Sequence, residues 1–240
     1  MKKLLLLSLS FLCTTNLPAQ LPTGPEVVAA AIQHHDPKGR WSELAFSANR
    51  QTSTEVDGQQ VENSAAFRID NRNGTFAGRA KYDDIPYLHV VTADTCFGVL
   101  ENPIFAQGYD IREGLLGCES ATRMYHFFSY MLGVPMKLND PGTQIQEKVQ
   151  RKEMDGKACY EVKVTYPPAI GEETWLFYFQ ESDYQLVAAQ FYKDARTKDG
   201  ELIFYRDYTK LRKVKLPQTL IWETMPDHTF LATDRYQFKK

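Results

Sequence analysis

Short segments that alternate between apolar and polar residues follow one another along most of this chain, with turn residues between them. Strands that are not separated by helices pair antiparallel, because parallel neighbours need a long crossover connection. This excludes a doubly wound α/β fold. The segments expected to be strands are 41–47, 50–56, 61–70, 75–82, 146–153, 158–166, 174–180, 185–193, 201–208, 216–224 and 229–238.

The composition agrees with a sheet protein. Aromatic residues make up 12% of the chain, from 14 Phe, 13 Tyr and 3 Trp, and aromatic side chains favour strands. A hydrophobic content of 43% and a charged content of 24% exclude a disordered, collagen-like or multi-span membrane protein. The formal net charge of -2 provides no positive electrostatic potential that would attract a polyphosphate, so nucleic acid is not an expected partner.

Two helices are expected beside the strands. Thr23-Gly24-Pro25-Glu26 is a capping box, and the helix after it must end at Asp36, before Pro37. The second helix ends at Gly133, and its apolar stripe consists of Ala121, Met124, Tyr125, Phe128, Met131 and Leu132. We therefore expect an α+β, mainly β fold: one unclosed, curved antiparallel sheet of about ten strands, with helices covering its concave side.

The first twenty residues have the pattern of a signal peptide. Lys2 and Lys3 precede an apolar stretch from Leu4 to Leu12, and small residues follow before residue 20. Export through the Sec pathway, most simply to a periplasm, is the expectation. Cleavage removes two lysines and no acids, so 26 basic and 30 acidic residues remain, a net charge of -4. A lipid-anchored N-terminus at Cys13 is the alternative. Residues 21–240 contain no linker or composition shift and are expected to form a single domain.

Three cysteines remain after such a cleavage. Cys96 and Cys118 are a possible disulfide in an oxidising compartment, which would leave Cys159 free. The alternative is that all three are small buried hydrophobic residues. The chain has no CxxC pair and no Cys/His zinc spacing, so no metal site is expected.

The most conspicuous polar cluster is His34-His35-Asp36. Neighbouring histidines on a helix point about 100° apart and cannot bind one ion together, whereas histidines are favoured in a last helical turn. An acid-base role for His35 and Asp36 is the sharper alternative. Because the chain also has no GxSxG elbow and no glycine-rich phosphate loop, we expect a non-catalytic protein without a cofactor.

Segment 174–180 is apolar on both faces. Such a strand is either buried on both sides or faces a ligand space on one of them. Ordinary core packing is the simpler interpretation. If a cavity exists, its expected lining is Tyr125, Phe128 and Met131 from the second helix, and Trp175, Phe177 and Phe179 from this strand.

A group of basic residues precedes Leu216-Pro217. It contains Lys210, Arg212, Lys213 and Lys215. A solvated hairpin tip explains this group, and contact with anionic lipid head groups is the alternative.

Several segments resemble a family of secreted proteins of Gram-negative bacteria that is known only as a domain of unknown function. They include residues 32–41, 132–142 and 174–179, together with 191–194, 199–201, 215–219 and Trp222. That family in turn is similar in architecture to the LolA/LolB group of periplasmic lipoprotein-sorting proteins. The resemblance implies an unclosed antiparallel barrel with helices as a lid over an apolar cavity, and a lipid or lipoprotein acyl chain as the ligand.

The functional expectation is an exported, non-catalytic binding protein that holds an acyl chain or a similar apolar ligand. A cell-envelope module for protein interaction or sensing is the second reading, and an enzyme that uses His35 and Asp36 is the third. Peripheral contact with the envelope fits the first two readings. The sequence does not decide the oligomeric state.

Overall fold

A computed structural model describes residues 21–82, 85–102, 115–171, 173–194 and 199–239. The expected signal peptide, residues 1–20, and the alternative lipid anchor at Cys13 lie outside the described residues.

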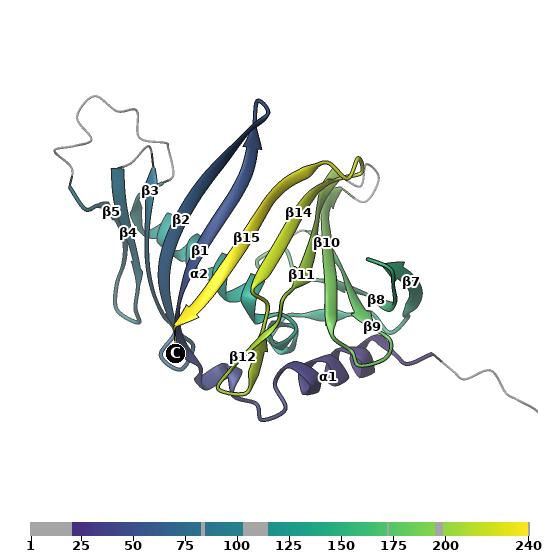
Figure 1. The fold of residues 1–240 in the computed structure, drawn as a ribbon. Coiled ribbons are helices and arrows are strands. Elements are labelled where there is room, and N and C mark those ends of the chain that lie inside the picture. Colours follow the sequence, from purple (N-terminus) through teal and green to yellow (C-terminus); the bar gives the residue numbers. More distant parts are fainter. Residues whose placement is uncertain (1–20, 83–84, 103–114, 172, 195–198, 240) are drawn as a thin grey trace, which may run out of the picture.

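One curved antiparallel sheet of 13 strands forms most of the protein (Figure 1). Its strand order is β5-β4-β3-β2-β1-β15-β14-β11-β10-β9-β8-β6, and β7 also pairs with β8. In this order the first strand of the chain lies beside the last. The strands are β1 (Ala45–Val56), β2 (Gln59–Asp70), β3 (Thr75–Tyr82), β4 (Ile85–Val91), β5 (Cys96–Leu100), β6 (Gln144–Ile145), β7 (Gln150–Met154), β8 (Lys157–Thr165), β9 (Thr174–Gln180), β10 (Leu186–Asp194), β11 (Asp199–Arg206), β14 (Thr219–Met225) and β15 (Phe230–Lys239).

The expected fold class is confirmed: the protein is mainly β, and its large antiparallel sheet is unclosed. The strand count differs from about ten, because β4, β5 and the two-residue β6 were not expected. Pro86 lies in an apolar run rather than an alternating one, and a proline argues against a strand. The expected segments 41–47 and 50–56 were wrong as two strands. They form the short 3-10 helix η1 (Trp41–Glu43) and the single strand β1.

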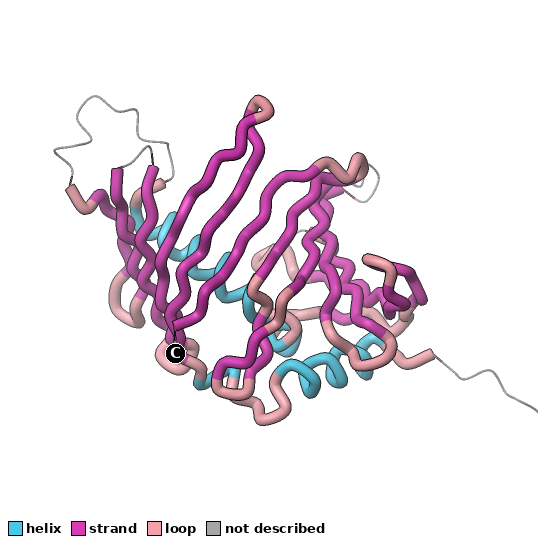
Figure 2. The backbone as a smooth tube through the Cα atoms, in the orientation of Figure 1, coloured by secondary structure: helices cyan, strands magenta, loops and turns pink. Residues whose placement is uncertain are grey.

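Both expected helices are present (Figure 2). Helix α1 (Gly24–His35) begins with the expected capping box: the Glu26 backbone N–H donates to Thr23 Oγ1 at 3.4 Å, and the Thr23 N–H donates to Glu26 Oε2 at 2.8 Å. Helix α2 (Gly117–Gly133) ends at the expected Gly133 and is followed by the 3-10 helix η3 (Met136–Asn139). The long helix α2 crosses the concave side of the sheet, and α1 runs along the lower ends of the strands.

The main core fills the space between α2 and the concave face. Phe128 of α2 stacks on Phe67 of β2, with the ring centroids 4.1 Å apart, and only 2% of Phe128 is exposed. The aromatic residues Trp175, Phe177 and Phe179 of β9 belong to the same core. A second, smaller cluster around Tyr178 packs on the other face of β9. Segment 174–180 is therefore buried on both sides, which was the simpler of the two interpretations.

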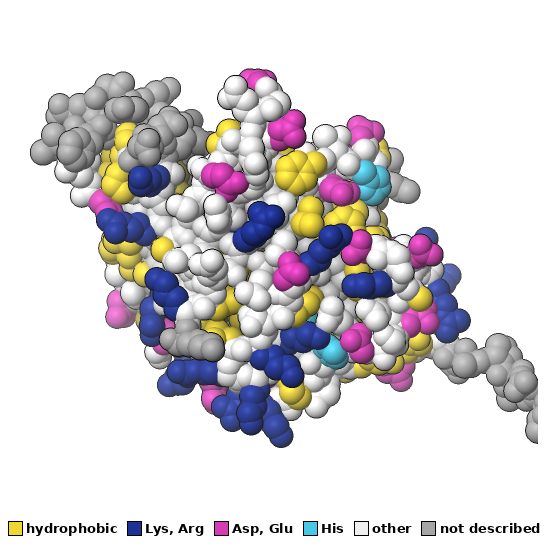
Figure 3. All heavy atoms as spheres, viewed as in Figure 1, with side chains coloured by type: hydrophobic (Ala, Val, Ile, Leu, Met, Phe, Trp, Pro, Cys, Tyr) yellow, Lys and Arg dark blue, Asp and Glu magenta, His cyan; other side chains and the backbone are white. Residues whose placement is uncertain are grey.

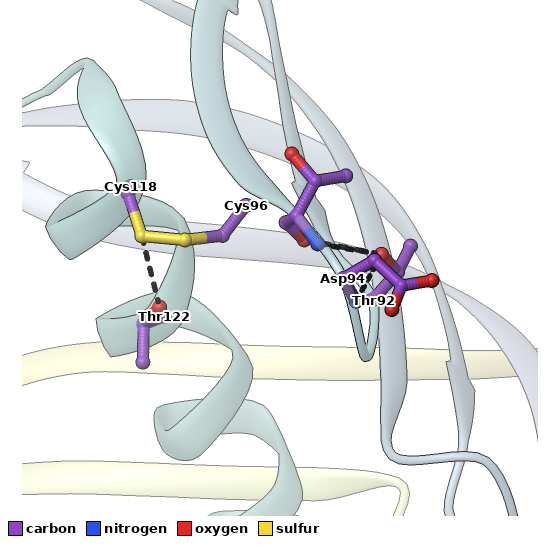
Figure 4. The surroundings of a disulfide bond; sticks show 6 residues. Thr92, Asp94, Cys96, Cys118 and Thr122 are labelled. Carbon is purple, nitrogen blue, oxygen red and sulfur yellow. Dashed lines mark hydrogen bonds between the residues drawn. A yellow bond between two sulfur atoms is a disulfide. The ribbon is translucent and has the colours of Figure 1, made fainter.

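A disulfide links the edge of the sheet to the start of α2 (Figure 4). It joins Cys96 of β5 to Cys118, which are 22 residues apart in sequence and have Cα atoms 4.8 Å apart. Cys118 is exposed, so this residue is not a small buried hydrophobe. Cys159 is free and buried, and burial raises its thiol pKa to about 11.

Removing the Phe128 ring tests whether α2 is held by this core. We expect Phe128→Ala to lower the free energy of unfolding by about 3–5 kcal/mol, because the ring leaves a cavity against Phe67. Urea unfolding monitored by circular dichroism measures the change. Phe230→Ala is the matched control, since 45% of Phe230 is exposed, and should change stability by less than about 1 kcal/mol. Equal losses in the two variants would contradict this packing.

Replacing the disulfide tests whether it restrains the unfolded chain. The Cys96→Ser/Cys118→Ser double variant should lose about 3 kcal/mol of stability, because the closed loop of 22 residues limits the unfolded ensemble. Urea unfolding with and without a reductant measures this. The reductant should destabilise the wild type and leave the double variant unchanged. An unchanged wild type under reduction would show that the link contributes nothing.

Candidate functional site: a groove beside the second helix

A groove of about 900 Å³ lies between α2, the segment after η3 and the β8–β9 connection. Its volume is in the range of sites that hold small organic molecules. The residues that line it are Glu119, Thr122, Arg123, His126, Ser129, Tyr130, Lys137, Asp140, Pro141, Thr143, Tyr166, Ala169, Ile170, Gly171, Glu173 and Trp175.

The floor of the groove is aromatic. The hydroxyl oxygens of Tyr130 and Tyr166 are 2.7 Å apart and share a hydrogen bond. The Tyr130 ring meets the Trp175 indole edge to face, with centroids 5.2 Å apart, and Trp175 in turn contacts Phe191 at 4.8 Å. Burial raises the pKa of both tyrosines, that of Tyr130 well above its usual value. The floor is therefore uncharged at neutral pH.

The rim of the groove carries charges of both signs. Lys137 and Asp140 form an ion pair across one turn, and Arg123 pairs with Glu119 at 3.7 Å along α2. Burial, and then the positive charge of Lys137, lower the pKa of His126, so its imidazole is neutral at pH 7. An uncharged floor below a charged rim suits an elongated apolar molecule with a polar end.

Two glycines allow the chain to shape this groove. Gly133 ends α2 in close contact with Trp41 and Lys137, where an added Cβ atom would lie within 2.6 Å of either side chain. Gly142 has φ +90°, a conformation that other residues rarely adopt, and sits against the Cδ1 atom of Ile170. Ile170 itself is 58% exposed, the highest exposed fraction among the large apolar side chains in the described part of the chain.

The six expected cavity residues lie together in or against the main core, but they differ in their relation to the groove. Trp175 lines the groove. Phe128 borders a separate space of about 20 Å³ between α2 and β1–β4. Phe177 and Phe179 are completely buried, the Tyr125 ring stacks on Phe76 at 5.9 Å, and Met131 accepts a hydrogen bond from Tyr205. A ligand contact for any of the six stays a prediction.

The sequence pattern missed most of the groove lining. His126 and Ser129 lie on the side of α2 opposite its apolar stripe, which a helical pattern assigns to solvent. Tyr166 and Ile170 come from the β8–β9 connection, which has no periodicity. The one available signal was a large apolar residue, Ile170, in a segment of turn residues.

His35 and Asp36 are structural rather than chemically free. His35 is fully buried; its Nδ1 donates to the Lys215 carbonyl oxygen at 3.2 Å, and its Nε2 accepts from the Leu186 N–H at 3.2 Å. The two carboxylate oxygens of Asp36 accept hydrogen bonds from the backbone N–H groups of Arg40 and Trp41, at 2.9 and 2.8 Å. With these atoms occupied, the pair offers neither a general base nor a general acid. In the described part of the chain, no group of three or more His, Cys, Asp or Glu side chains is placed to hold a metal ion.

A buried polar cluster lies on the concave face near α2. The Asp234 carboxylate accepts hydrogen bonds from Thr52 Oγ1 at 2.5 Å and from Trp222 Nε1 at 3.1 Å. Arg50 Nε is 3.9 Å from Asp234 Oδ1, and the guanidinium lies over the Phe128 ring at 5.2 Å. The cluster joins β1, β14 and β15 beneath α2, and of its residues only Trp222 was named from the sequence, as part of the family resemblance.

Comparison with solved structures places this architecture among LolA-type folds. A LolA superfamily protein from Nitrosomonas europaea superposes with a TM-score of 0.56 at 11% identity, over 90% of this chain and 93% of that one. A domain from Vibrio parahaemolyticus described as an outer membrane lipoprotein-sorting protein gives a TM-score of 0.53 at 10% identity, over 90% and 92% of the two chains. A DUF1329 family protein from Desulfovibrio piger gives 0.53 at 9% identity with the same coverage. At these identities the likeness concerns the fold.

The chain belongs to the family of unknown function DUF6503, whose profile matches residues 2–236. A search of curated proteins found no match to this sequence. Among the described residues, no helix is both long and apolar enough to cross a membrane.

The burial of His35 predicts a pH-dependent stability. Burial lowers the pKa of His35 to about 3, so below about pH 6.5 the unfolded chain binds a proton that the folded protein does not. The contribution of His35 to the free energy of unfolding is therefore fully present above about pH 6.5. It falls toward pH 3 by up to about 1.4 kcal/mol per pH unit. Urea unfolding between pH 7.5 and 4.5 measures the slope.

A His35→Gln variant should be less stable at pH 7.5 and should show a shallower slope than the wild type. His228→Gln, at an exposed position, is the control and should keep the wild-type slope. Identical pH dependences of stability for His35→Gln and the wild type would contradict the attribution of this slope to His35.

Proposed function

We propose that this protein is an exported, non-catalytic binding protein that holds an acyl chain or a similar elongated apolar ligand in the groove beside α2. The observation that carries the proposal is the groove of about 900 Å³ with an aromatic, uncharged floor and the exposed side chain of Ile170 at its edge. An exposed apolar side chain at the edge of a groove with an aromatic floor can contact an apolar ligand in that groove.

The expected binding energy fits a carrier. Each buried methylene group contributes about 0.8 kcal/mol, so a long acyl chain gains on the order of 10 kcal/mol before the cost of ordering it. The groove also has polar rim residues, Arg123, His126 and Lys137, that can meet the polar end of such a ligand. The fold likeness to a LolA superfamily protein and to a lipoprotein-sorting domain supports a lipid or lipoprotein acyl chain as the ligand.

The proposed site of action is the periplasm. It rests on the signal-peptide pattern of residues 1–20, and a lipid anchor at Cys13 would place the protein on a membrane of the same compartment. A disulfide between Cys96 and Cys118 agrees with an oxidising compartment.

Protein interaction at the envelope is the second candidate function, and one observation favours it. Large apolar side chains are exposed where β1, β2 and β15 end: Val56 by 54%, Val61 by 38%, Phe230 by 45% and Leu231 by 40%. β1 pairs with both β2 and β15, so these side chains gather at one end of the sheet. Catalysis is the least supported function, because the atoms of His35 and Asp36 are bound to backbone groups.

A charge placed at the edge of the groove tests the proposal. We expect Ile170→Asp to weaken the binding of a dansyl-labelled fatty acid at least about tenfold, because the carboxylate must be desolvated against the acyl chain. Fluorescence titration of delipidated protein measures the affinity, and unlabelled palmitate provides the competition.

Val99→Asp is the matched control, since Val99 is 43% exposed on β5 and does not line the groove. This variant should bind like the wild type. Equal affinities for Ile170→Asp, Val99→Asp and the wild type would remove the groove from the binding site, and absence of any competable binding would reject the proposed ligand class.

A further inference from the structure

Five cationic side chains are exposed at the lower end of the protein. Lys38 and Arg40 lie between α1 and η1, and Lys210, Arg212 and Lys213 lie on the hairpin of β12 (Thr209–Leu211) and β13 (Val214–Leu216). We call these five residues the cationic end. Figure 3 shows basic side chains gathered at this end of the molecule, where Figure 1 places β12 and the connection after α1.

The charges of the cationic end are not compensated locally. Within the described part of the chain, none of its five residues forms an ion pair with a carboxylate. Three acidic side chains are exposed in this region. Glu43 lies on η1, three residues after Arg40, Asp207 accepts a hydrogen bond from Thr219, and Asp183 acts electrostatically on His34 and Lys215. A protein whose formal net charge is -2 thus presents a local positive surface.

The hairpin is firmly anchored behind its charged turn. β12 and β13 form a two-stranded sheet apart from the main sheet, and the inward residues Val214 and Leu216 are completely buried. Just before β12, the Tyr208 hydroxyl donates to the Leu186 carbonyl oxygen at 2.7 Å, and its ring meets His35 at 5.1 Å. The base of the hairpin is therefore fixed to β10 and to the end of α1.

Lys215 belongs to this anchor rather than to the cationic end. Its Nζ atom is 2.7 Å from His34 Nε2 and donates to Gln185 Oε1 at 2.6 Å. Burial lowers the Lys215 pKa, and the ammonium group also lies over the Tyr208 ring at 5.3 Å. Of the four basic residues that the sequence groups together, three point their charge to solvent.

The turn itself carries cations at a conformational cost. Arg212 has φ 48° and Lys213 has φ 77°, and positive φ at both central residues is the type I′ geometry that Asn-Gly adopts with least strain. Residues with longer side chains are strained there. Asn-Gly would therefore fit this turn with less strain than Arg212-Lys213.

The cationic end also lies next to the groove. Arg40 precedes Trp41, whose indole lies beside Gly133 at the end of α2, and the Lys137 side chain lies beside the same glycine. Lys137 lines the groove. Lys137 therefore lies between the groove and Trp41, and Trp41 directly follows Arg40 of the cationic end.

We propose that the cationic end docks this protein on a membrane surface that contains anionic phospholipid. The inference rests on the proposed function, because a groove that collects or delivers an acyl chain must approach a bilayer. Charges on exposed turns match a head-group layer, whereas a protein partner would need an apolar, aromatic centre in the contact surface. Each basic residue near an anionic surface contributes about fivefold to the membrane partition coefficient.

The test uses a variant that removes two charges and relieves the strain. The Arg212→Asn/Lys213→Gly double variant of the mature chain should fold at least as stably as the wild type, because Asn-Gly suits the turn. Its partition onto vesicles of phosphatidylethanolamine with 30% phosphatidylglycerol should fall about 30-fold, measured by co-sedimentation at low salt. The wild type should not bind pure phosphatidylcholine vesicles and should be released by about 0.5 M NaCl.

Lys148→Asn/Lys152→Asn is the matched control. Both lysines are exposed near β7, by the opposite end of α1, and the net charge changes by the same amount. This variant should keep wild-type partition. Equal partition of the two double variants, or equal binding of the wild type to neutral and anionic vesicles, would overturn the proposal. Binding of the wild type to polyglutamate but not to vesicles would also overturn it and would assign the cationic end to an acidic protein partner.

A second readout separates this inference from the proposed function. The Arg212→Asn/Lys213→Gly variant should bind the dansyl-labelled fatty acid like the wild type, because neither residue lines the groove. Vesicle binding that depends on these charges, without any fatty-acid binding, would retain the docking surface and reject the proposed ligand. Fatty-acid binding without charge-dependent vesicle binding would retain the proposed ligand and reject the docking surface.

Discussion

The packing of α2 against the concave face of an open sheet is the interaction on which the rest of the structure depends. A curved sheet that does not close leaves one apolar face without a partner, and a single helix must cover it. Phe128 provides the centre of this contact, with Phe67 below it and the Arg50 guanidinium over its ring. The Cys96–Cys118 disulfide holds the first turn of the helix to the sheet edge. Because one face of α2 is committed to the core, the opposite face is available to form the wall of a groove.

The contacts of helix α1 with the sheet and the hairpin explain the histidine-rich segment at its end. His35 connects α1 to β10 and β13 through two backbone hydrogen bonds, and Asp36 fixes the turn that leads to Trp41. These contacts place Trp41 against the end of α2, and they hold the β12–β13 hairpin against α1. A cluster that suggests catalysis in the sequence therefore serves to join the two helices and the hairpin.

Much of the fold could be predicted from the sequence, because alternation and capping are local properties. The capping box at Thr23 and the apolar stripe of α2 are recognised within a few residues, and the order of strands without intervening helices predicts an antiparallel sheet. The strand that contains Pro86 was not predicted, because its apolar residues do not alternate with polar ones. The groove could not be predicted for another reason. It brings the polar face of α2 next to Tyr166 and Ile170, which are about 40 residues away in sequence, and a periodic pattern contains no information about such a contact. The sequence also left the pairing of Cys96 and Cys118 open, since spacing alone does not report their distance in space.

In the function that we propose, the groove takes up an apolar chain beside α2, and the cationic end meets an anionic surface at the adjacent end. We therefore expect a lipid to occupy the groove in the cell. Native mass spectrometry of the mature protein, purified from a Gram-negative periplasm without detergent, tests it most directly, and extraction identifies what is bound. We expect a major species with one lipid per protein chain, and loss of that species in the Ile170→Asp variant. A wild-type protein that carries no lipid, and takes none up when fatty acid is added, would contradict it.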